Sequence, residues 1–303
     1  MTAFNTTVPV NQATFQQVHD VFMEEYKNTP NLIKMCRTVT DEAISYRWDF
    51  QEKINFVDVT PGSSIARERP QIRQVTATPK PRASRLASDI FTQAQIKPQE
   101  LTNFSNLQME AVHRDHNQLI FDEVNSALDA GNILPDGHVI GTTSAPITFN
   151  VDHLLNVGRI FANEGVNKAT YIITANEYNS LMQDERFVSR FFNDRTPLPF
   201  GYLSESPAAG VQLYVVPQYP SQSQFVKTGL LPSSDESTNG SNQVFAMATD
   251  AFGAFFNKTP HFKTWYDDET FTWLVDTCYQ ADVSLLRPNG LIITNSENVV
   301  SGT

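Results

Sequence analysis

The residues best suited to chemistry in this sequence are His113, Arg114, Asp115 and His116, which stand together in a stretch with helical spacing. Side chains three residues apart share one face of a helix, so the two histidines could chelate a metal ion. A zinc site needs three or four ligands, however, and no second cluster of histidine or cysteine completes this one. We therefore interpret these residues as part of a solvated helix face.

Other candidates for catalysis or metal binding also lack partners. Nothing in the sequence pairs Cys36 with a histidine, so we interpret it as a buried or idle thiol. The carboxylates of Asp267, Asp268 and Glu269 could bind a metal ion, but they stand where a hairpin turn is expected. The sequence contains no G-x-S-x-G, P-loop or G-x-G-x-x-G motif. It therefore predicts a protein that is not an enzyme and that has no catalytic, cofactor-binding or metal-binding residues.

Composition argues against several classes of protein. The chain has 303 residues, of which 40% are hydrophobic and 18% are charged, and this balance supports a sizeable folded core. No apolar run approaches the roughly 18 residues of a transmembrane helix, so no membrane contact is expected, and the first residues do not resemble a secretory signal. Two cysteines suggest a reducing compartment. A formal net charge of -11 argues against nonspecific binding of nucleic acid.

One basic segment interrupts this acidic chain. Residues 61–88 carry six cations against a single acid, Glu68, which gives a net charge of +5. The cations are Arg67, Arg69, Arg73, Lys80, Arg82 and Arg85. A nucleic-acid patch would need stacking aromatic residues, which this segment lacks. A solvated loop and an arm lying on an acidic surface of a neighbouring copy remain, and electrostatic complementarity favours the arm.

The hydrophobic pattern predicts a mixture of helices and short strands. Residues 105–130 form the longest predicted helix, and residues 12–35 have helical spacing with a break at Pro30. Apolar side chains alternate over eight positions in residues 271–286, which predicts an unusually long strand. Further helices are expected at residues 150–164 and 176–192, and further strands at residues 171–174, 211–217, 243–249, 262–266 and 291–294.

Large apolar residues, three of them aromatic, alternate with polar ones in residues 44–50, which predicts another strand. It leads towards the basic segment and carries Trp48 and Phe50 on one side. We expect these two side chains to need apolar partners, which a neighbouring subunit could supply.

The order of these parts resembles the HK97-fold major capsid proteins of tailed double-stranded DNA bacteriophages. The sharpest likeness lies in residues 251–294, where an Ala-Phe-Gly-Ala-Phe-Phe segment, a strand, an acidic turn and a long strand precede Leu286-Arg287-Pro288 and a closing strand. Residues 171–190 are also similar, because a strand ending at Thr174-Ala175 leads into a helix. The likeness covers nearly the whole chain and rests on the order of the elements.

The resemblance implies an α+β fold with the named parts of that family. In chain order these would be an N-terminal arm (1–40), an extended E-loop (41–101), the first part of the P-domain with its spine helix (102–149), an A-domain (150–242), the return strands of the P-domain (243–286), and a closing strand with the C-terminal tail (287–303).

The resemblance also implies a structural function. Hexamers and pentamers of the chain would assemble in the host cytoplasm into an icosahedral phage head, which encloses DNA without binding it specifically. Scaffolding and portal proteins would be partners, and a decoration protein would be an optional one. The expected contacts between subunits are the six cations of the basic segment together with Trp48 and Phe50.

The sequence departs from the best-known member of that family in two ways. It does not show the long coiled-coil scaffolding segment, so a separate scaffolding protein would serve unless that segment lies outside this sequence. Lys80 has no identifiable asparagine partner, so no crosslinking is predicted. An encapsulin-like protein compartment and a soluble α/β enzyme are the alternatives.

Overall fold

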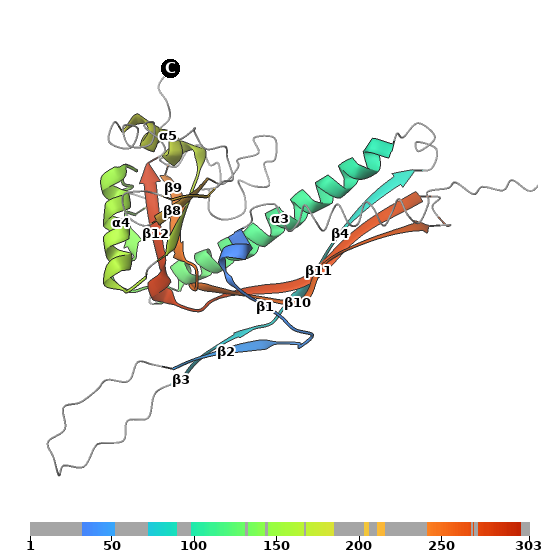
Figure 1. Ribbon diagram of the computed structural model, residues 1–303, viewed down its shortest axis with the longest axis horizontal. Coiled ribbons are helices and arrows are strands. Elements are labelled where there is room, and N and C mark those ends of the chain that lie inside the picture. The colour runs from blue at the N-terminus through green and yellow to red at the C-terminus, as the bar shows by residue number, and fades with distance from the viewer. Residues whose placement is uncertain are drawn as a thin grey trace, which may run out of the picture.

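The computed structural model describes residues 32–51, 72–89, 98–130, 133–142, 145–166, 168–184, 203–205, 211–215, 241–267, 269 and 272–297. Within these ranges the chain forms an elongated lobe, a compact lobe and a two-stranded ribbon that projects away from both (Figure 1). The mixture of helices and strands expected from the sequence is confirmed. No helix in the described ranges is long and apolar enough to cross a membrane.

The elongated lobe contains a four-stranded sheet in the order β1-β10-β11-β4. Strands β10 (Phe252–Asp267) and β11 (Thr272–Leu285) form a long antiparallel hairpin. Strand β4 (Lys80–Asp89) pairs antiparallel with β11, and β1 (Arg37–Thr40) pairs parallel with the first part of β10. The alternation expected in β11 is confirmed, because its described residues of one parity are all buried: Val275, Thr277, Tyr279, Ala281, Val283 and Leu285.

Helix α3 (Pro98–Asp129) lies along this sheet and provides the other side of the main core (Figure 1). The helix predicted at residues 105–130 is therefore confirmed, and it begins earlier. The short 3-10 helix η1 (Leu32–Met35) contacts α3 and buries Leu32 and Ile33 in the same core. Residues 32–40, which the resemblance would place in the N-terminal arm, thus form part of the elongated lobe, here called the body.

The compact lobe contains a six-stranded sheet in the order β5-β12-β9-β6-β8-β7. The β12–β5 and β6–β8 pairs are parallel, and the other three pairs are antiparallel. Helices α4 and α5 lie beside this sheet (Figure 1). The Asn150 side chain caps α4 by accepting a hydrogen bond from the backbone N–H of His153 at 2.9 Å. The 3-10 helix η2 (Pro288–Gly290) joins β11 to the closing strand. The bounds are β5 (Val139–Ile140), α4 (Val151–Asn163), β6 (Ala169–Ile173), α5 (Ala175–Gln183), β7 (Leu203–Glu205), β8 (Val211–Val215), β9 (Ser241–Ala248) and β12 (Leu291–Glu297).

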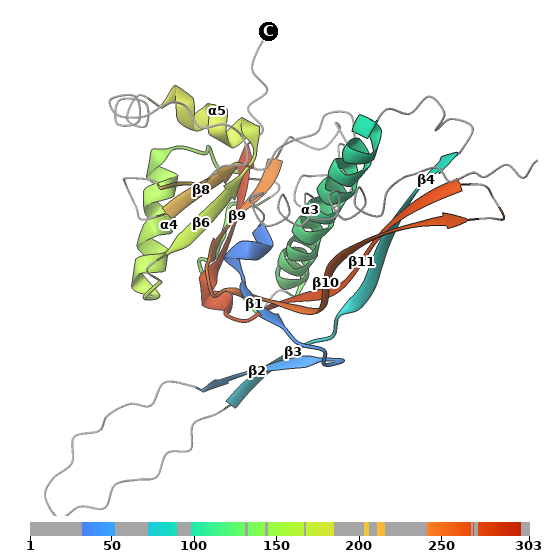
Figure 2. The same ribbon diagram turned by 45° about the vertical axis from the view of Figure 1, so that its right-hand side comes forward.

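The projecting ribbon consists of β2 (Tyr46–Gln51) and β3 (Ile72–Ala77), which pair antiparallel with each other. No other strand in the described part of the chain joins their sheet. The ribbon starts beside β1 and points away from the elongated lobe (Figure 2). Residues 52–71, which follow its far end and include Arg67 and Arg69, lie outside the described residues.

Strand β4 is the main element that the sequence did not predict. Its residues were expected to form a loop or a projection, because the segment has few large apolar side chains. The structure instead pairs β4 with β11 over ten positions, from Lys80 opposite Ala281 to Asp89 opposite Thr272. Backbone hydrogen bonding holds an edge strand even where one face is exposed and polar. The sequence interpretation of β4 as irregular was therefore wrong.

Candidate subunit interface

The ribbon is anchored to the body by an aromatic side chain at its root. Trp48 is only 3% exposed and packs against Phe255 and Leu286. The ring of Tyr46 lies edge-on to Trp48, with centroids 5.0 Å apart, and stacks on Phe255 at 5.4 Å. Trp48 was expected to need partners from a neighbouring subunit, but its own chain already buries it.

The pairing register determines which side chains share the face that carries Trp48. Directly opposite residues of an antiparallel pair point to the same side. Phe50 is opposite Arg73, and Trp48 is opposite Val75. Burial decreases along this face away from the body, because Trp48 is buried, Phe50 is half-buried and Arg73 is exposed. The far end of the face therefore presents an aromatic ring beside a cation.

Two hydrogen bonds join the root of the ribbon, where both of its strands meet the body, to the long hairpin. The backbone N–H of Thr78, just after β3, donates to Asp282 Oδ2 at 2.8 Å. Before β2, the Asn257 side-chain amide donates to the carbonyl of Ala43 at 2.7 Å. With the buried indole, these contacts fix the direction in which the ribbon leaves the body.

Arg82 and Arg85 have partners within their own chain. Arg82 on β4 donates to the carboxylate of Asp115 on α3, which also accepts from the Tyr279 hydroxyl. These partners could not be predicted from local patterns, because Asp115 is 33 residues from Arg82 and Tyr279 is 164 residues from Asp115.

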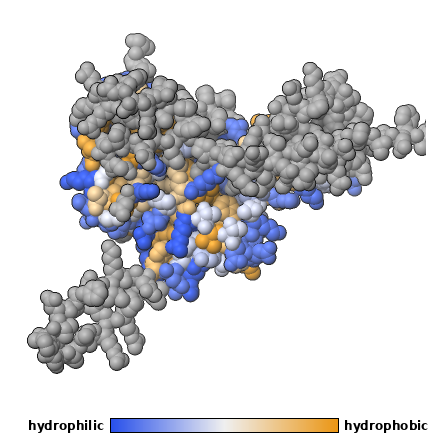
Figure 3. All heavy atoms as spheres, viewed as in Figure 1, coloured by the Kyte–Doolittle hydropathy of each residue, from blue (hydrophilic) through white to orange (hydrophobic). Residues whose placement is uncertain are grey.

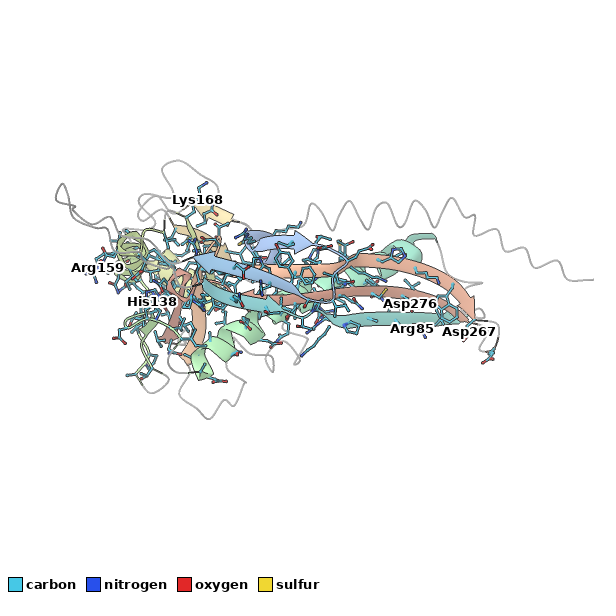
Figure 4. The ribbon with its side chains drawn as sticks, turned by 90° about the horizontal axis from the view of Figure 1, so that it is seen from below. Arg85, His138, Arg159, Lys168, Asp267 and Asp276 are labelled. Atoms are coloured by element: carbon cyan, nitrogen blue, oxygen red, sulfur yellow. The ribbon has the colours of Figure 1, made fainter. Side chains whose placement is uncertain are left out.

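Arg85 forms a bidentate pair with Asp276 of β11, with Nε–Oδ1 and Nη2–Oδ2 distances of 2.6 and 2.9 Å (Figure 4). Its guanidinium also lies over the ring of Trp265, 5.2 Å from the centroid, and the indole N–H donates to Asp276 at 2.9 Å. The hydrogen bonds from Arg85 lower the pKa of Asp276 below its usual value. Arg82 and Arg85 therefore attach β4 to the body.

The six cations of the basic segment thus differ in their surroundings. Arg82 and Arg85 pair within the chain, Arg67 and Arg69 lie outside the described residues, and Arg73 and Lys80 are exposed. In the coloured part of Figure 3, hydrophilic residues alternate with groups of hydrophobic ones.

The interpretation of His113 and His116 as part of a solvated helix face was wrong. The side chain of His116 is fully buried between α3 and the sheet. Its ring lies edge-on to the rings of Tyr279 and Phe256, with centroid distances of 4.8 and 5.5 Å. Burial lowers the pKa of His116 to about 3 and that of His113 to about 4. This face of α3 lies against the sheet because the apolar residues of the same helix pack in the main core. Within the described ranges, no group of three or more possible ligands could hold a metal ion.

The remaining candidates agree with the sequence interpretation where they are described. Cys36 is a buried free thiol, and burial raises its pKa to about 12. Asp267 ends β10, and its carboxylate accepts from the backbone N–H of Glu269 at 3.1 Å, as in a hairpin turn. Asp268 lies outside the described residues.

Comparison with solved structures identifies the fold. The capsid of cyanophage P-SCSP1u matches with a TM-score of 0.62 and 13% identity, over 89% of each chain. The mature capsid of bacteriophage PhiM1 matches with a TM-score of 0.58 and 12% identity, over 88% of this chain and 86% of that one. A virus-like particle from Pyrococcus furiosus matches with a TM-score of 0.54 and 11% identity, over 92% and 98%. No family model and no curated protein matches the sequence. The chain therefore has the HK97-like fold of tailed-phage major capsid proteins, as its resemblance to them predicted.

Proposed function

We propose that this chain is a major capsid protein, which assembles into the icosahedral head of a tailed phage and encloses double-stranded DNA. The observation that carries the proposal is the likeness to phage capsid structures over nearly nine tenths of the chain. The described residues contain no cluster of metal-ligating side chains, and His116 of α3 is buried against the sheet. The function proposed is structural, in keeping with the likeness to capsid proteins.

The parts of the chain receive the roles expected from this fold. The ribbon would belong to the E-loop, and α3, the long hairpin and β4, which pairs with it, would form the P-domain. The compact lobe would be the A-domain, and the residues before Leu32 would be the N-terminal arm. Scaffolding and portal proteins are the further partners of such a shell, and a decoration protein is an optional one. An acidic chain lining the shell would not hold the enclosed DNA tightly.

The contact between subunits is assigned to the far end of the ribbon. Phe50 and Arg73 share the face of the ribbon that carries Trp48, at the end away from the body. Lys80 is exposed near the root of the ribbon, and Arg67 and Arg69 lie between β2 and β3 in the sequence. Each exposed ion pair contributes only about 0–1 kcal/mol, but repetition over many copies sets the register of a lattice. An obligate interface of this kind buries on the order of 2,000 Å² or more.

Reversal of the charges of Arg67, Arg69 and Arg73 together tests this assignment. The triple variant should fold normally by circular dichroism but form few or no shells by electron microscopy. A matched control changes Arg159 and Lys168 to glutamate, since both are exposed on the compact lobe (Figure 4). Normal shells from the triple variant would show that the basic segment is not the contact.

The match to a virus-like particle from Pyrococcus furiosus favours a second candidate, a compartment with an encapsulin-like role. The contents of purified particles separate the two functions. Packaged DNA supports the phage head, whereas an enclosed cargo protein without DNA supports the compartment. Sedimentation tests both, because a shell runs as a particle of megadalton mass and a soluble enzyme as a small closed oligomer.

A further inference from the structure

Strand β4 is the last strand of the four-stranded sheet, and no strand of the described residues pairs with its outer edge (Figure 4). It pairs with β11 over ten positions without a bulge, so this edge is long and regular. Lys80, Pro81 and residues 83–85 are exposed, so the edge is open to the surface. An open, regular edge is a template for a further strand.

The pairing registers show in which direction the backbone groups of β4 point. The N–H of Asp41 donates to the carbonyl of Phe256, so the backbone of Phe256 faces β1 and not β11. Opposite residues of an antiparallel pair face either towards each other or away from each other. Ala281, which is opposite Phe256, therefore faces β4. Lys80, which is opposite Ala281, in turn faces β11.

The direction of the backbone groups alternates along a strand, so every second residue from Pro81 onwards faces the open edge. Ala83, Arg85 and Ala87 thus present their backbone N–H and C=O groups outwards. Pro81 agrees with this assignment, because a residue without an N–H costs the ladder nothing where it faces away from the neighbouring strand. The open edge therefore offers alternating donors and acceptors to a second strand.

The surroundings of the edge allow a second copy of this basic strand to approach. The charges of Arg82 and Arg85 would repel another copy, but each is paired with a carboxylate of its own chain, Asp115 and Asp276 respectively. A hollow of about 390 Å³ lies between α3 and residues 81–84 of β4, and it leaves space beside the edge on the side of the helix.

We propose that the β4 strands of two copies pair antiparallel across a twofold axis in the assembled shell. A twofold contact is self-complementary, so the outward N–H groups of each strand meet outward carbonyls of the other. The register with Ser84 opposite itself gives the longest ladder in which no like charges are directly opposite. It places Lys80 opposite Ser88 and Arg85 opposite Ala83. The inference rests on the proposed function, because it assigns a contact within the shell.

The substitution Ser84→Cys tests this register. Two opposite residues that face away from each other have Cα atoms about 4.5 Å apart, which is within the range of a disulfide. In a Cys278→Ser background, mild oxidation of assembled shells should link most subunits into dimers on a non-reducing gel. Thr259→Cys is the matched control, because Thr259 is exposed on β10, and it should stay monomeric. Shells in which Ser84→Cys also stays monomeric would overturn the inference and leave the proposed function intact.

The substitution Ala83→Pro tests the backbone assignment, because it removes an outward N–H and no bond to β11. The free subunit should fold normally by circular dichroism. The subunit concentration needed for assembly should rise roughly tenfold or more, since each twofold contact loses two hydrogen bonds. Ser84→Pro is the contrasting variant, because it removes a bond to β11 and should destabilise the subunit itself. Unchanged assembly of Ala83→Pro, or loss of its fold, would refute the inference. A wild-type protein that forms no particles would overturn the proposed function and this inference with it.

Discussion

Gly253 on β10 lies directly beneath the indole that anchors the ribbon. A methyl group added at this position would approach Trp48 Cζ2 to 2.8 Å, Leu286 Cδ1 to 2.9 Å and Trp48 Cε2 to 3.0 Å. Carbon atoms not bonded to each other make their best contacts at about 3.5–4.0 Å. Gly253 is paired on both sides within the sheet, opposite Ser284 and Arg37, so its backbone cannot easily move away.

We therefore predict that Gly253→Ala destabilises the subunit by about 1–2 kcal/mol. In an open strand position alanine would be better than glycine by about 0.5–1 kcal/mol, because glycine loses more backbone freedom on folding. Forcing extra volume into a packed core typically costs about 1–3 kcal/mol. The cost of overpacking is the larger of the two here, because the closest neighbour of the added methyl group is the rigid Trp48 ring, which is itself buried.

Urea unfolding followed by circular dichroism measures this change, and a double-mutant cycle assigns it to the indole. Trp48→Leu shortens the side chain above Gly253, so the alanine should cost little in that background, and the coupling should be about 1 kcal/mol or more. Gly253→Ala should also form fewer shells. The added methyl group would tilt the Trp48 indole and so change the direction in which the ribbon leaves the body. A Gly253→Ala subunit as stable as wild type, with additive effects in the double variant, would refute the packing argument.

Two further predictions concern the core and its boundary. Burial lowers the pKa of His116 to about 3, so the unfolded chain binds more protons than the folded one below about pH 6.5 and the free energy of unfolding should fall as the pH drops from 6.5 towards 3. His116→Phe should lose part of this slope in urea titrations at pH 7, 5 and 4, and an identical slope would count against a neutral buried imidazole. Deletion of residues 1–29 should leave the subunit folded but weaken assembly. Deletion of residues 1–36 should also remove about 4 kcal/mol or more of stability, because it takes away two buried aliphatic side chains of η1. Equal stability of the two truncated chains would mean that η1 is not part of the core.

The long strand β11 and helix α3 could be predicted because each carries its own periodicity. Alternation in residues 272–285 and helical spacing in residues 105–129 reflect the side that faces the core, so a local pattern was sufficient. The order of these elements was also enough to indicate the capsid fold, although no family model and no curated protein matches the sequence.

The arrangement around β4 could not be predicted, because it depends on contacts between distant residues. Asp276 is 191 residues from Arg85, and nothing near either residue indicates that they pair. A run of cations with few apolar residues predicts an exposed segment, because its sequence does not show that a distant strand pairs with it. The burial of His116 was missed for the same reason, since which helix face meets the sheet is a tertiary property.

A cryo-electron microscopy reconstruction of the purified, assembled protein would show whether the chain forms a shell. We expect closed shells built from fivefold and sixfold rings, in which the ribbon of each subunit reaches over its neighbour. A homogeneous monomer or small closed oligomer, with the ribbon folded back on its own body, would contradict it.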